Sequence, residues 1–385
     1  MNPTYLLALG TAVPPVKMPQ AKMADFMAQI LHLAPSEARK LKALYRHTAI
    51  EHRYSVLHDF EQIDTQFYLS GEAPFPSTAA RMQIYEQEAL PLAVAAVEDL
   101  RQNLRENGLT GELQGLTHLI TVSCTGMYAP GLDIQLIEHY GLPTGIQRTA
   151  INFMGCYASF NALKVGHAIC QSQPEARVLI VGVELCTLHL QKSALEDDLI
   201  ANSLFGDGAG AVLLSARPQG QKNLCLSNFA SSLLPQGKTE MAWHIHDAGF
   251  SMRLSTYVPH LLEGAIAPMI GQMLNQIGMA LPAIDHYAIH PGGRKILEAI
   301  EKGLAISKEQ NHLAYEVLRD YGNMSSVTIL FVWKKLWEEI QTAQHQQHIL
   351  SMAFGPGLAI EASLMQVFMP AQKAENARKQ EKVAI

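Results

Sequence analysis

The chain has 385 residues, of which 48% are hydrophobic and 17% charged, and its formal net charge is −6. That length and composition are typical of a globular protein with one large core or two similar halves. The mild acidity argues against a duplex-binding protein, and no apolar run reaches the ~18–20 residues of a membrane span. Because the sequence also starts without a signal-peptide pattern, we expect a cytoplasmic protein with no nucleic-acid partner and no transmembrane segment.

The cysteines give no sign of a disulfide framework or a metal site. There are five, an odd number, in a chain long enough to fold without covalent cross-links. None belongs to a C-x-x-C pair or to a Cys/His cluster with zinc-site spacing. We therefore expect reduced thiols and no bound metal, and any catalytic cysteine must be distinguished by its surroundings.

The first notable element is a basic amphipathic segment, Pro35–Arg53, whose apolar spacing predicts a helix. A charge run of this kind is usually a solvated helix face. It becomes a binding surface only if the rest of the chain implies a phosphorylated substrate. The basic residues concerned are Lys40, Lys42, Arg46, His47 and Arg53.

Apolar strands alternate with helices through the rest of the chain, which favours a layered α/β fold. A polar stretch that begins at Ala216 separates two halves, residues 1–217 and 218–368. Residues 369–385 are charged and are predicted to be a frayed helix or a disordered tail. Strands are predicted at His118–Cys124, Arg177–Leu185, Gly210–Ser215, Tyr287–His290 and Ile349–Phe354, and helices at Ser159–Gln171 and Ser326–Ile340.

One cysteine stands out by its local sequence. Cys156 follows Gly155 within Asn152–Ser159, just before a predicted helix. The positive end of a helix dipole would favour the thiolate there, and a thiolate is a good acyl acceptor. A Gly-Cys pair at a helix start is weak evidence by itself, because a buried cysteine is more often a small apolar residue.

Two polar residues of the second half can complete a catalytic set around Cys156. His290 ends a short strand and enters the turn Pro291–Gly293, so it would face a cavity rather than pack in the sheet. A lone histidine is usually structural, but an imidazolium beside Cys156 would form an ion pair. Asn323 precedes a predicted helix, where it is either a helix cap or an amide donor to an oxyanion.

Two glycine-rich loops are predicted, at Phe205–Ala211 and Phe354–Gly357. Neither matches a dinucleotide-binding pattern, because the helix that must follow the glycines is missing. We interpret both as backbone that passes close to a reacting group.

These segments together resemble the type III polyketide synthases of the chalcone and stilbene synthase family, and the bacterial-type branch in particular. The similarity runs from Gly10 to Gly357, nearly the whole chain apart from the tail. It implies a homodimer with the thiolase fold, in which each subunit has two similar layered αβαβα halves. The most specific strings are HPGG at His290–Gly293, YGNMSS at Tyr321–Ser326, LFGDGAGA at Leu204–Ala211 and FGPG at Phe354–Gly357.

The resemblance also implies a catalytic triad, here Cys156, His290 and Asn323, and coenzyme A thioesters as substrates with no metal or other cofactor. Phe205 matches a phenylalanine that stands where the coenzyme A tunnel meets the cavity. The other implied cavity residues are Cys124, His189, Met252, Gly355 and Pro356, with Ala129 at the position donated across the dimer. Among the family's basic coenzyme A positions Lys40 matches, whereas two others are Ala43 and His47 here, and we expect Lys42 and Arg46 to compensate. The predicted coenzyme A contacts are Lys40, Lys42, Arg46, His47, Gly292 and Gly293.

The departures from the plant enzymes bear on the starter. A small Ala129 and a flexible Met252 would make room for an alkyl chain, whereas a bulky His189 would fill the pocket meant for a planar aromatic group. We therefore favour a medium or long fatty acyl starter.

The predicted reaction is iterative decarboxylative condensation of malonyl-CoA onto an acyl-CoA starter held on Cys156. Cyclisation would then give an alkylpyrone, a resorcinol or a phloroglucinol-type product. Two alternatives stay open. One is a ketoacyl-ACP synthase III-like enzyme, whose histidine motif usually reads His-Gln-Ala-Asn rather than HPGG, and the other is a non-catalytic relative that binds acyl-CoA.

Overall fold

The computed structural model describes residues 3–60, 67–68, 75–111, 113–341 and 345–370. In this part of the chain a nine-stranded sheet runs through the molecule in the order β11-β12-β13-β8-β1-β7-β6-β4-β5. The strands of the first half are β1 (Thr4–Ala12), β4 (His118–Ser123), β5 (Gln147–Asn152), β6 (Arg177–Leu185) and β7 (Asp207–Ser215). Those of the second half are β8 (Asn223–Leu233), β11 (His286–Ile289), β12 (His348–Gly355) and β13 (Ala359–Phe368).

Helices cover the sheet, and two short hairpins complete the described fold. The helices of the first half are α1 (Gln20–Ile30), α2 (Pro35–His47), α3 (Thr78–Glu106), α4 (Leu132–Tyr140), α5 (Ala158–Ser172) and α6 (Glu196–Leu204). Those of the second half are α7 (Val258–Asn275), α8 (Arg294–Leu304), α9 (His312–Tyr321) and α10 (Thr328–Glu339). The hairpins are β2 (Val16–Pro19) with β3 (His52–Ser55), and β9 (Met241–His246) with β10 (Gly249–Leu254).

The two halves repeat one pattern of strand pairing. In the first, β4 runs parallel to β6, and β7 runs antiparallel to both β6 and β1, between which it lies. In the second, β11 runs parallel to β12, and β12, β13 and β8 follow antiparallel. The antiparallel pair β1–β8 joins them. The predicted arrangement of two similar α/β halves is therefore confirmed, although no sequence repeat announces it.

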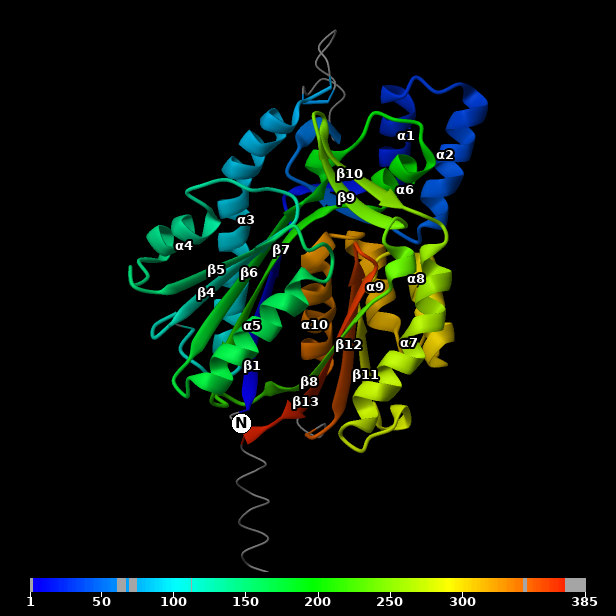
Figure 1. The fold of residues 1–385 in the computed structure, drawn as a ribbon. Helices are drawn as coiled ribbons and strands as arrows, with labels where there is room; N and C mark the ends of the chain where they lie inside the picture. Colours follow the sequence, from blue (N-terminus) through cyan, green and yellow to red (C-terminus); the bar gives the residue numbers. More distant parts are fainter. Residues whose placement is uncertain (1–2, 61–66, 69–74, 112, 342–344, 371–385) are drawn as a thin grey trace, which may run out of the picture.

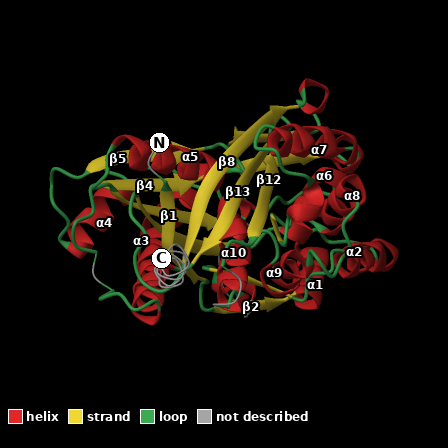
Figure 2. Ribbon diagram, turned by 90° about the horizontal axis from the view of Figure 1, so that it is seen from below, coloured by secondary structure: helices red, strands yellow, loops and turns green. Residues whose placement is uncertain are grey.

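The helices lie in three layers outside and between the strands (Figure 1). α3 packs on β1, β6 and β7 at one side, and α7 packs on α8 and β8 at the other. α5 and α10 lie between and contact strands of both halves, within one shared apolar core. Figure 2 shows the strands crossing the middle, with α4 toward one end and α8 toward the other. This layering brings the first turns of α5 and α10 to the centre of the molecule.

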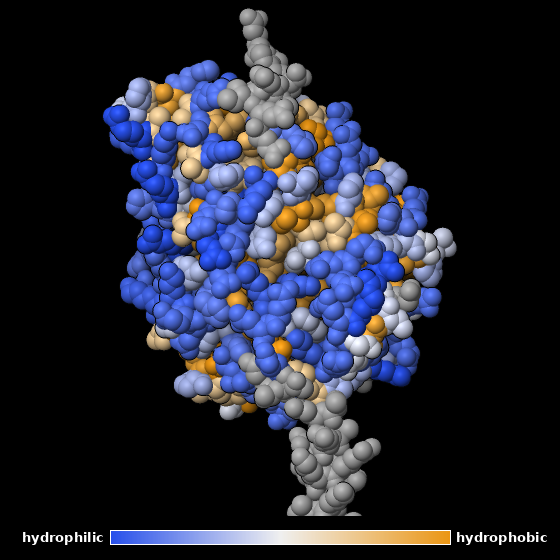
Figure 3. All heavy atoms as spheres, turned by 180° about the vertical axis from the view of Figure 1, so that it is seen from behind, coloured by the Kyte–Doolittle hydropathy of each residue, from blue (hydrophilic) through white to orange (hydrophobic). Residues whose placement is uncertain are grey.

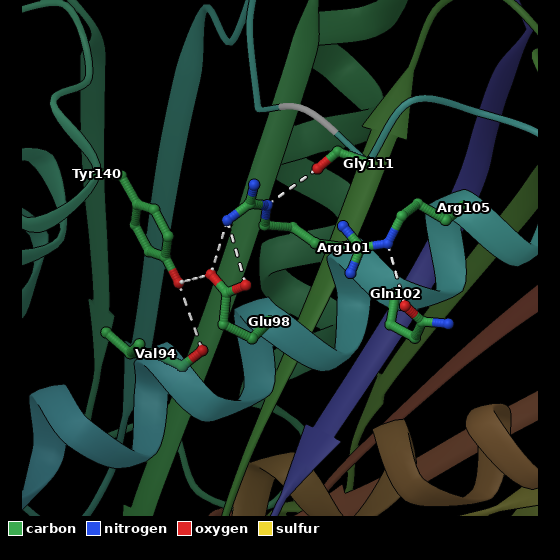
Figure 4. Close-up of polar contacts among 7 residues, drawn as sticks. All are labelled: Val94, Glu98, Arg101, Gln102, Arg105, Gly111 and Tyr140. Atoms are coloured by element: carbon green, nitrogen blue, oxygen red, sulfur yellow. Dashed lines mark hydrogen bonds and ion pairs between the residues drawn. The ribbon is translucent and has the colours of Figure 1, made fainter.

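Polar contacts tie α3 to its surroundings on the outer side (Figure 4). Arg101 Nη1 lies 2.9 Å from Glu98 Oε1, and its Nε donates to the Gly111 carbonyl at 3.0 Å. The hydroxyl of Tyr140, at the end of α4, donates to Glu98 Oε1 at 3.0 Å. Pairs this exposed contribute about 1 kcal/mol or less each, so α3 is held mainly by its apolar side.

Most of the predicted elements are confirmed to within a few residues, and two predictions are wrong. The predicted helix Pro35–Arg53 ends at His47, and Ala49 adopts a φ of 62°, which breaks it. Arg53 lies on β3, buried rather than on a cationic rim. The glycine run that we took for a loop belongs to β7. Its glycines are explained by packing, since a Cβ at Gly210 would lie 2.6 Å from the Leu330 side chain of α10. The glycines let the helix approach the strand.

Among the described residues no helix is long and apolar enough to cross a membrane. Figure 3 shows a face that is mostly hydrophilic, with smaller apolar patches. The same residues include no group of three or more His, Cys, Asp or Glu side chains arranged to hold a metal ion. The predicted tail lies outside the described residues beyond position 370.

Candidate active site

The central helices begin beside two of the predicted catalytic residues. Cys156 lies two residues before α5, and Asn323 lies between α9 and the turn that starts α10. Because the halves share one architecture, these two segments approach the same point from the two sides of the molecule. Both side chains are nearly buried, with 7% of Cys156 and 2% of Asn323 exposed.

His290 comes directly after β11, as its sequence position predicts. Its backbone N–H donates to the Met352 carbonyl at 2.8 Å, which extends the pairing with β12 by one residue. The side chain is 1% exposed, and neither ring nitrogen has a hydrogen-bond partner among the described residues. Buried polar atoms are normally paired, so this imidazole has hydrogen-bonding capacity left for a ligand.

One cavity is lined by all three residues, Cys156, His290 and Asn323. Its lining is otherwise mostly apolar. It therefore combines a few polar groups with an apolar wall, as small-molecule sites do. The other lining side chains include Cys124, Phe205, Met241, Trp243, Met252, Leu254, Phe354 and Pro356.

The hairpin turn between β12 and β13 closes the cavity behind the nucleophile. A Cβ at Gly355 would lie 2.7 Å from the Tyr157 ring and 3.2 Å from the Cys156 nitrogen. A Cβ at Gly155 would lie 2.3 Å from Pro356. Glycine at both positions allows the two turns to meet, as expected for backbone close to a reacting group.

The amide of Asn323 has a fixed orientation. Its Oδ1 accepts from the Ser325 N–H at 2.9 Å, and its Nδ2 donates to the Gly292 carbonyl at 3.2 Å. The amide nitrogen carries two hydrogens. One goes to the Gly292 carbonyl, and hydrogen bonding by the Asn323 side chain opposes the larger effect of burial on the pKa of the Cys156 thiol. The amide therefore faces the sulfur.

Burial sets the protonation of the Cys156–His290 pair. It raises the pKa of the Cys156 thiol to about 12, and it lowers the pKa of the His290 imidazole to about 3. Either charge alone would therefore be poorly solvated there. Moving the thiol proton to the imidazole creates both charges together, and their attraction offsets part of that cost. The thiolate of Cys156 is therefore expected only when His290 is an imidazolium.

Three predicted cavity residues, His189, Ala129 and Gly355, do not line this cavity. His189 lines a smaller neighbouring one. Its Nε2 donates to the Thr125 carbonyl at 2.7 Å, its Nδ1 accepts from the Phe250 N–H at 3.0 Å, and its ring stacks 4.0 Å from that of Phe250. It therefore anchors the β9–β10 hairpin. Ala129 lies in an exposed loop before α4, beside a separate surface hollow.

Two residues near the site were missed by the sequence reasoning. Trp243 of β9 lines the cavity, and its indole N–H donates to the Cys124 carbonyl at 3.0 Å. Glu184, fully buried on β6, accepts from the Cys124 N–H at 2.9 Å, from the Thr125 hydroxyl at 2.7 Å and from the Ser326 hydroxyl. An acidic residue inside the apolar run RVLIVGVEL was a usable signal for the second.

Replacing Glu184 by glutamine is expected to lower the free energy of unfolding by about 1–3 kcal/mol. The glutamine NH₂ group would replace one carboxylate oxygen, so a buried donor that now bonds to that oxygen would lose its acceptor. Urea denaturation measures the change. Glu98→Gln, which alters the exposed carboxylate that pairs with Arg101, is the matched control and should cost less. Equal losses would show that the Glu184 contacts contribute nothing particular.

A groove lined by residues of α2 and α8 lies beside the cavity and shares Leu254, Gly292 and Ile296 with it. Of the predicted coenzyme A contacts, it includes His47, Gly292 and Gly293.

Two basic residues that we did not predict, Arg294 and Lys295, also line this groove, directly after HPGG. Lys42 and Arg46 line a different groove, where Lys42 lies 2.5 Å from Asp25. Lys40 is exposed on the face of α2 that carries Leu44.

A thiol, an imidazole and an amide that line one apolar cavity can together support acyl transfer to sulfur, in which hydrogen-bond donors stabilise negative charge on a carbonyl oxygen. Such a site, in a two-half α/β fold, defines an acyltransferase of the condensing kind.

Comparison with known proteins specifies this class. The family models for the N-terminal and C-terminal domains of chalcone and stilbene synthases match residues 2–218 and 226–369. The chain therefore belongs to the chalcone and stilbene synthase family and is an acyltransferase of the type III polyketide synthase type.

Individual relatives agree with this assignment. The alpha-pyrone synthesis polyketide synthase-like Pks18 of Mycobacterium tuberculosis is 29% identical over 93% of this chain and 90% of that protein. The 3,5-dihydroxyphenylacetyl-CoA synthase of Streptomyces toyocaensis is 29% identical over 94% of this chain and 89% of that protein. The crystal structure of PKS-I from the brown alga Ectocarpus siliculosus matches with a TM-score of 0.84 and 24% identity, over 94% of this chain and 98% of that one. The last likeness bears on the fold, which is the thiolase fold that we predicted.

Proposed function

We propose that this chain extends an acyl group held on Cys156 by repeated decarboxylative condensation with malonyl-CoA. The observation that carries the proposal is the convergence of the Cys156 thiol, the unpartnered His290 imidazole and the oriented Asn323 amide on a single, mostly apolar cavity. Family membership supports coenzyme A thioesters as substrates and a reaction that needs no metal or other cofactor.

Loading of the starter uses Cys156 and His290. The sulfur attacks the carbonyl carbon of the acyl-CoA thioester while the imidazole accepts the thiol proton. The tetrahedral intermediate collapses, the bond to the coenzyme A sulfur breaks, and the proton passes to that sulfur. The products are an acyl-enzyme thioester and free coenzyme A, and His290 is neutral again, which is the form that its burial favours.

Extension uses His290 and Asn323. Both donate to the thioester oxygen of malonyl-CoA as the bond to the carboxylate breaks, so carbon dioxide leaves and an enolate forms. The enolate carbon attacks the acyl carbonyl on Cys156, whose thiolate leaves. The chain, now longer by one ketide unit on coenzyme A, returns to Cys156 by a second transfer. Phe205, at the cavity wall, keeps water away from the enolate.

An alkyl starter fits the lining better than a polar one. Met241, Met252 and Leu254 are flexible apolar side chains on the hairpin side of the cavity. The mycobacterial relative is named for alpha-pyrone synthesis, which favours an alkylpyrone product over a resorcinol or a phloroglucinol. Coenzyme A thioesters are intracellular metabolites, so the proposed activity belongs in the cytoplasm.

The groove lined by residues of α2 and α8 is the proposed path of the coenzyme A arm, with its phosphates near the basic residues at its mouth. Replacing Arg294 and Lys295 together by glutamine is expected to raise the KM for malonyl-CoA about three- to tenfold, with a smaller change in kcat. Steady-state kinetics at low and high salt measures it. The matched double change of Lys42 and Arg46, in the other groove, separates the two surfaces. If the change of Lys42 and Arg46 has the larger effect on KM, the phosphates bind in that other groove instead.

A homodimer is the proposed assembly. β5 is the edge strand of the described sheet and pairs only with β4 there. Met127 and Met154, near its end, are 43% and 38% exposed. A second copy that covers this edge would bury both methionines and the loop that carries Ala129. Sedimentation velocity tests it.

The proposed activity is tested by incubating the protein with labelled malonyl-CoA and a panel of acyl-CoA starters. We expect extended, cyclised products by mass spectrometry, with fatty acyl starters preferred over aromatic ones. Use of malonyl-ACP in place of malonyl-CoA would favour a ketoacyl-ACP synthase III-like enzyme. Acyl-CoA binding without product or adduct would favour a non-catalytic relative.

A further inference from the structure

Arg53 is a fully buried arginine that reaches the segment carrying Phe205. Its side chain on β3 is 1% exposed. The guanidinium Nη1 donates to the main-chain carbonyl of Phe205 at 2.6 Å and to that of Asn202 at 2.9 Å. It therefore binds the end of α6 where the chain leaves the helix and enters the cavity wall.

Gln20 fixes the angle of that guanidinium. Arg53 Nε donates to Gln20 Oε1 at 2.9 Å, and Gln20 Nε2 donates to the Thr48 hydroxyl at 3.0 Å and to the Ser203 carbonyl at 2.7 Å. Because the donors of arginine lie in one rigid plane, contacts on two sides define its position closely. A lysine could not make them together.

The segment that Arg53 holds is paired to the one that carries Asn323. Phe205 and Asn323 form a parallel bridge, in which the Gly206 N–H donates to the Asn323 carbonyl at 2.9 Å and the Asn323 N–H donates to the Leu204 carbonyl at 2.9 Å. The stem of Arg53 packs at the same place. A Cβ at Gly322 would lie 2.8 Å from Arg53 Cγ.

We propose that Arg53 is a positioning residue, which holds the Phe205 ring and the Asn323 amide in register at the cavity for decarboxylation and extension. This rests on the proposed function. Arg53 donates its hydrogen bonds to Gln20, Asn202 and Phe205 rather than to Cys156 or His290, so its loss should affect extension more than loading. A displacement of about 1 Å at a reacting centre can cost on the order of 10²-fold in rate.

The test compares loading with extension in the full-length protein. Arg53→Lys keeps the charge and most of the stem but not the fork. We expect the kcat for malonyl-CoA-dependent extension to fall ~10- to 100-fold, while the KM changes less than about twofold and acylation of Cys156 stays near the wild-type rate. Gln20→Leu should produce a smaller loss of the same kind, and it serves if the first variant folds poorly.

Arg81→Lys is the matched control. Arg81 is also fully buried, but it donates to the carbonyls of Leu188 and Leu190 instead. It should lower Tm without changing the ratio of extension to loading. Parallel loss of both steps in Arg53→Lys, or an equal change of the ratio in Arg81→Lys, would overturn the proposal. A wild-type protein that loads but never extends would overturn the proposed function instead.

Discussion

Cys156→Ala is expected to abolish acyl-enzyme formation and to lower product formation by at least ~10³-fold. The alanine lacks the sulfur that takes the acyl group, and the remaining donors of His290 and Asn323 cannot hold the starter covalently. Intact-protein mass spectrometry after incubation with an acyl-CoA measures the adduct, and a product assay measures the turnover. The fold should survive, because the change removes one buried atom.

Alanine variants of two other cysteines, Cys124 and Cys170, are the controls for this prediction. Cys124 also lines the cavity, and its Sγ accepts from the Gly155 N–H at 3.0 Å, beside the nucleophile. Cys170, near the end of α5, is buried away from it. Alanine at either position should leave the adduct on Cys156. An adduct that disappears with Cys124 and persists without Cys156 would reassign the nucleophile.

His290→Gln is expected to lower the rate of product formation by ~10²- to 10⁴-fold, the usual contribution of a general acid–base. Glutamine retains a donor of similar reach but cannot accept the thiol proton. The loading step should therefore suffer more than the binding of either substrate. His312→Gln, at a surface histidine paired with Glu339, is the matched control and should be silent.

The same variant should shift the pH dependence of Cys156 alkylation. In the proposed mechanism the imidazole takes the thiol proton, and the resulting imidazolium stabilises the thiolate. Burial already raises the pKa of the Cys156 thiol, and the glutamine variant lacks the group that would offset this effect. The midpoint of iodoacetamide inactivation should therefore move to higher pH in His290→Gln. An unchanged midpoint would mean that His290 does not accept the proton.

Strand and helix positions followed from apolar patterning where elements are buried, as in β6 and α5, whose predicted and observed bounds nearly coincide. Patterning failed where a tertiary contact overrides it. The glycines of β7 looked like a loop because the reason for them, the approach of α10, lies more than a hundred residues away in sequence. Similarly, nothing local shows that Arg53 points into the protein rather than along a cationic helix.

That Cys156, His290 and Asn323 line one cavity was predictable because each stands next to a local signal: a glycine before Cys156, HPGG at His290 and a helix start after Asn323. What these signals did not contain is side-chain direction. His189 was expected at the starter pocket and instead carries two hydrogen bonds of the β9–β10 hairpin. Glu184 and Trp243 were missed, since their roles depend on contacts between distant segments.

The central claim is that one cysteine both receives the starter and carries the growing chain. The most direct measurement is peptide mass spectrometry of the enzyme, acid-quenched during turnover with an acyl-CoA and malonyl-CoA. We predict that the peptide containing Cys156 carries the starter and, in a second population, the starter lengthened by ketide units. A folded protein that shows only the unextended starter there, or shows the extended chain on another residue, would contradict the account.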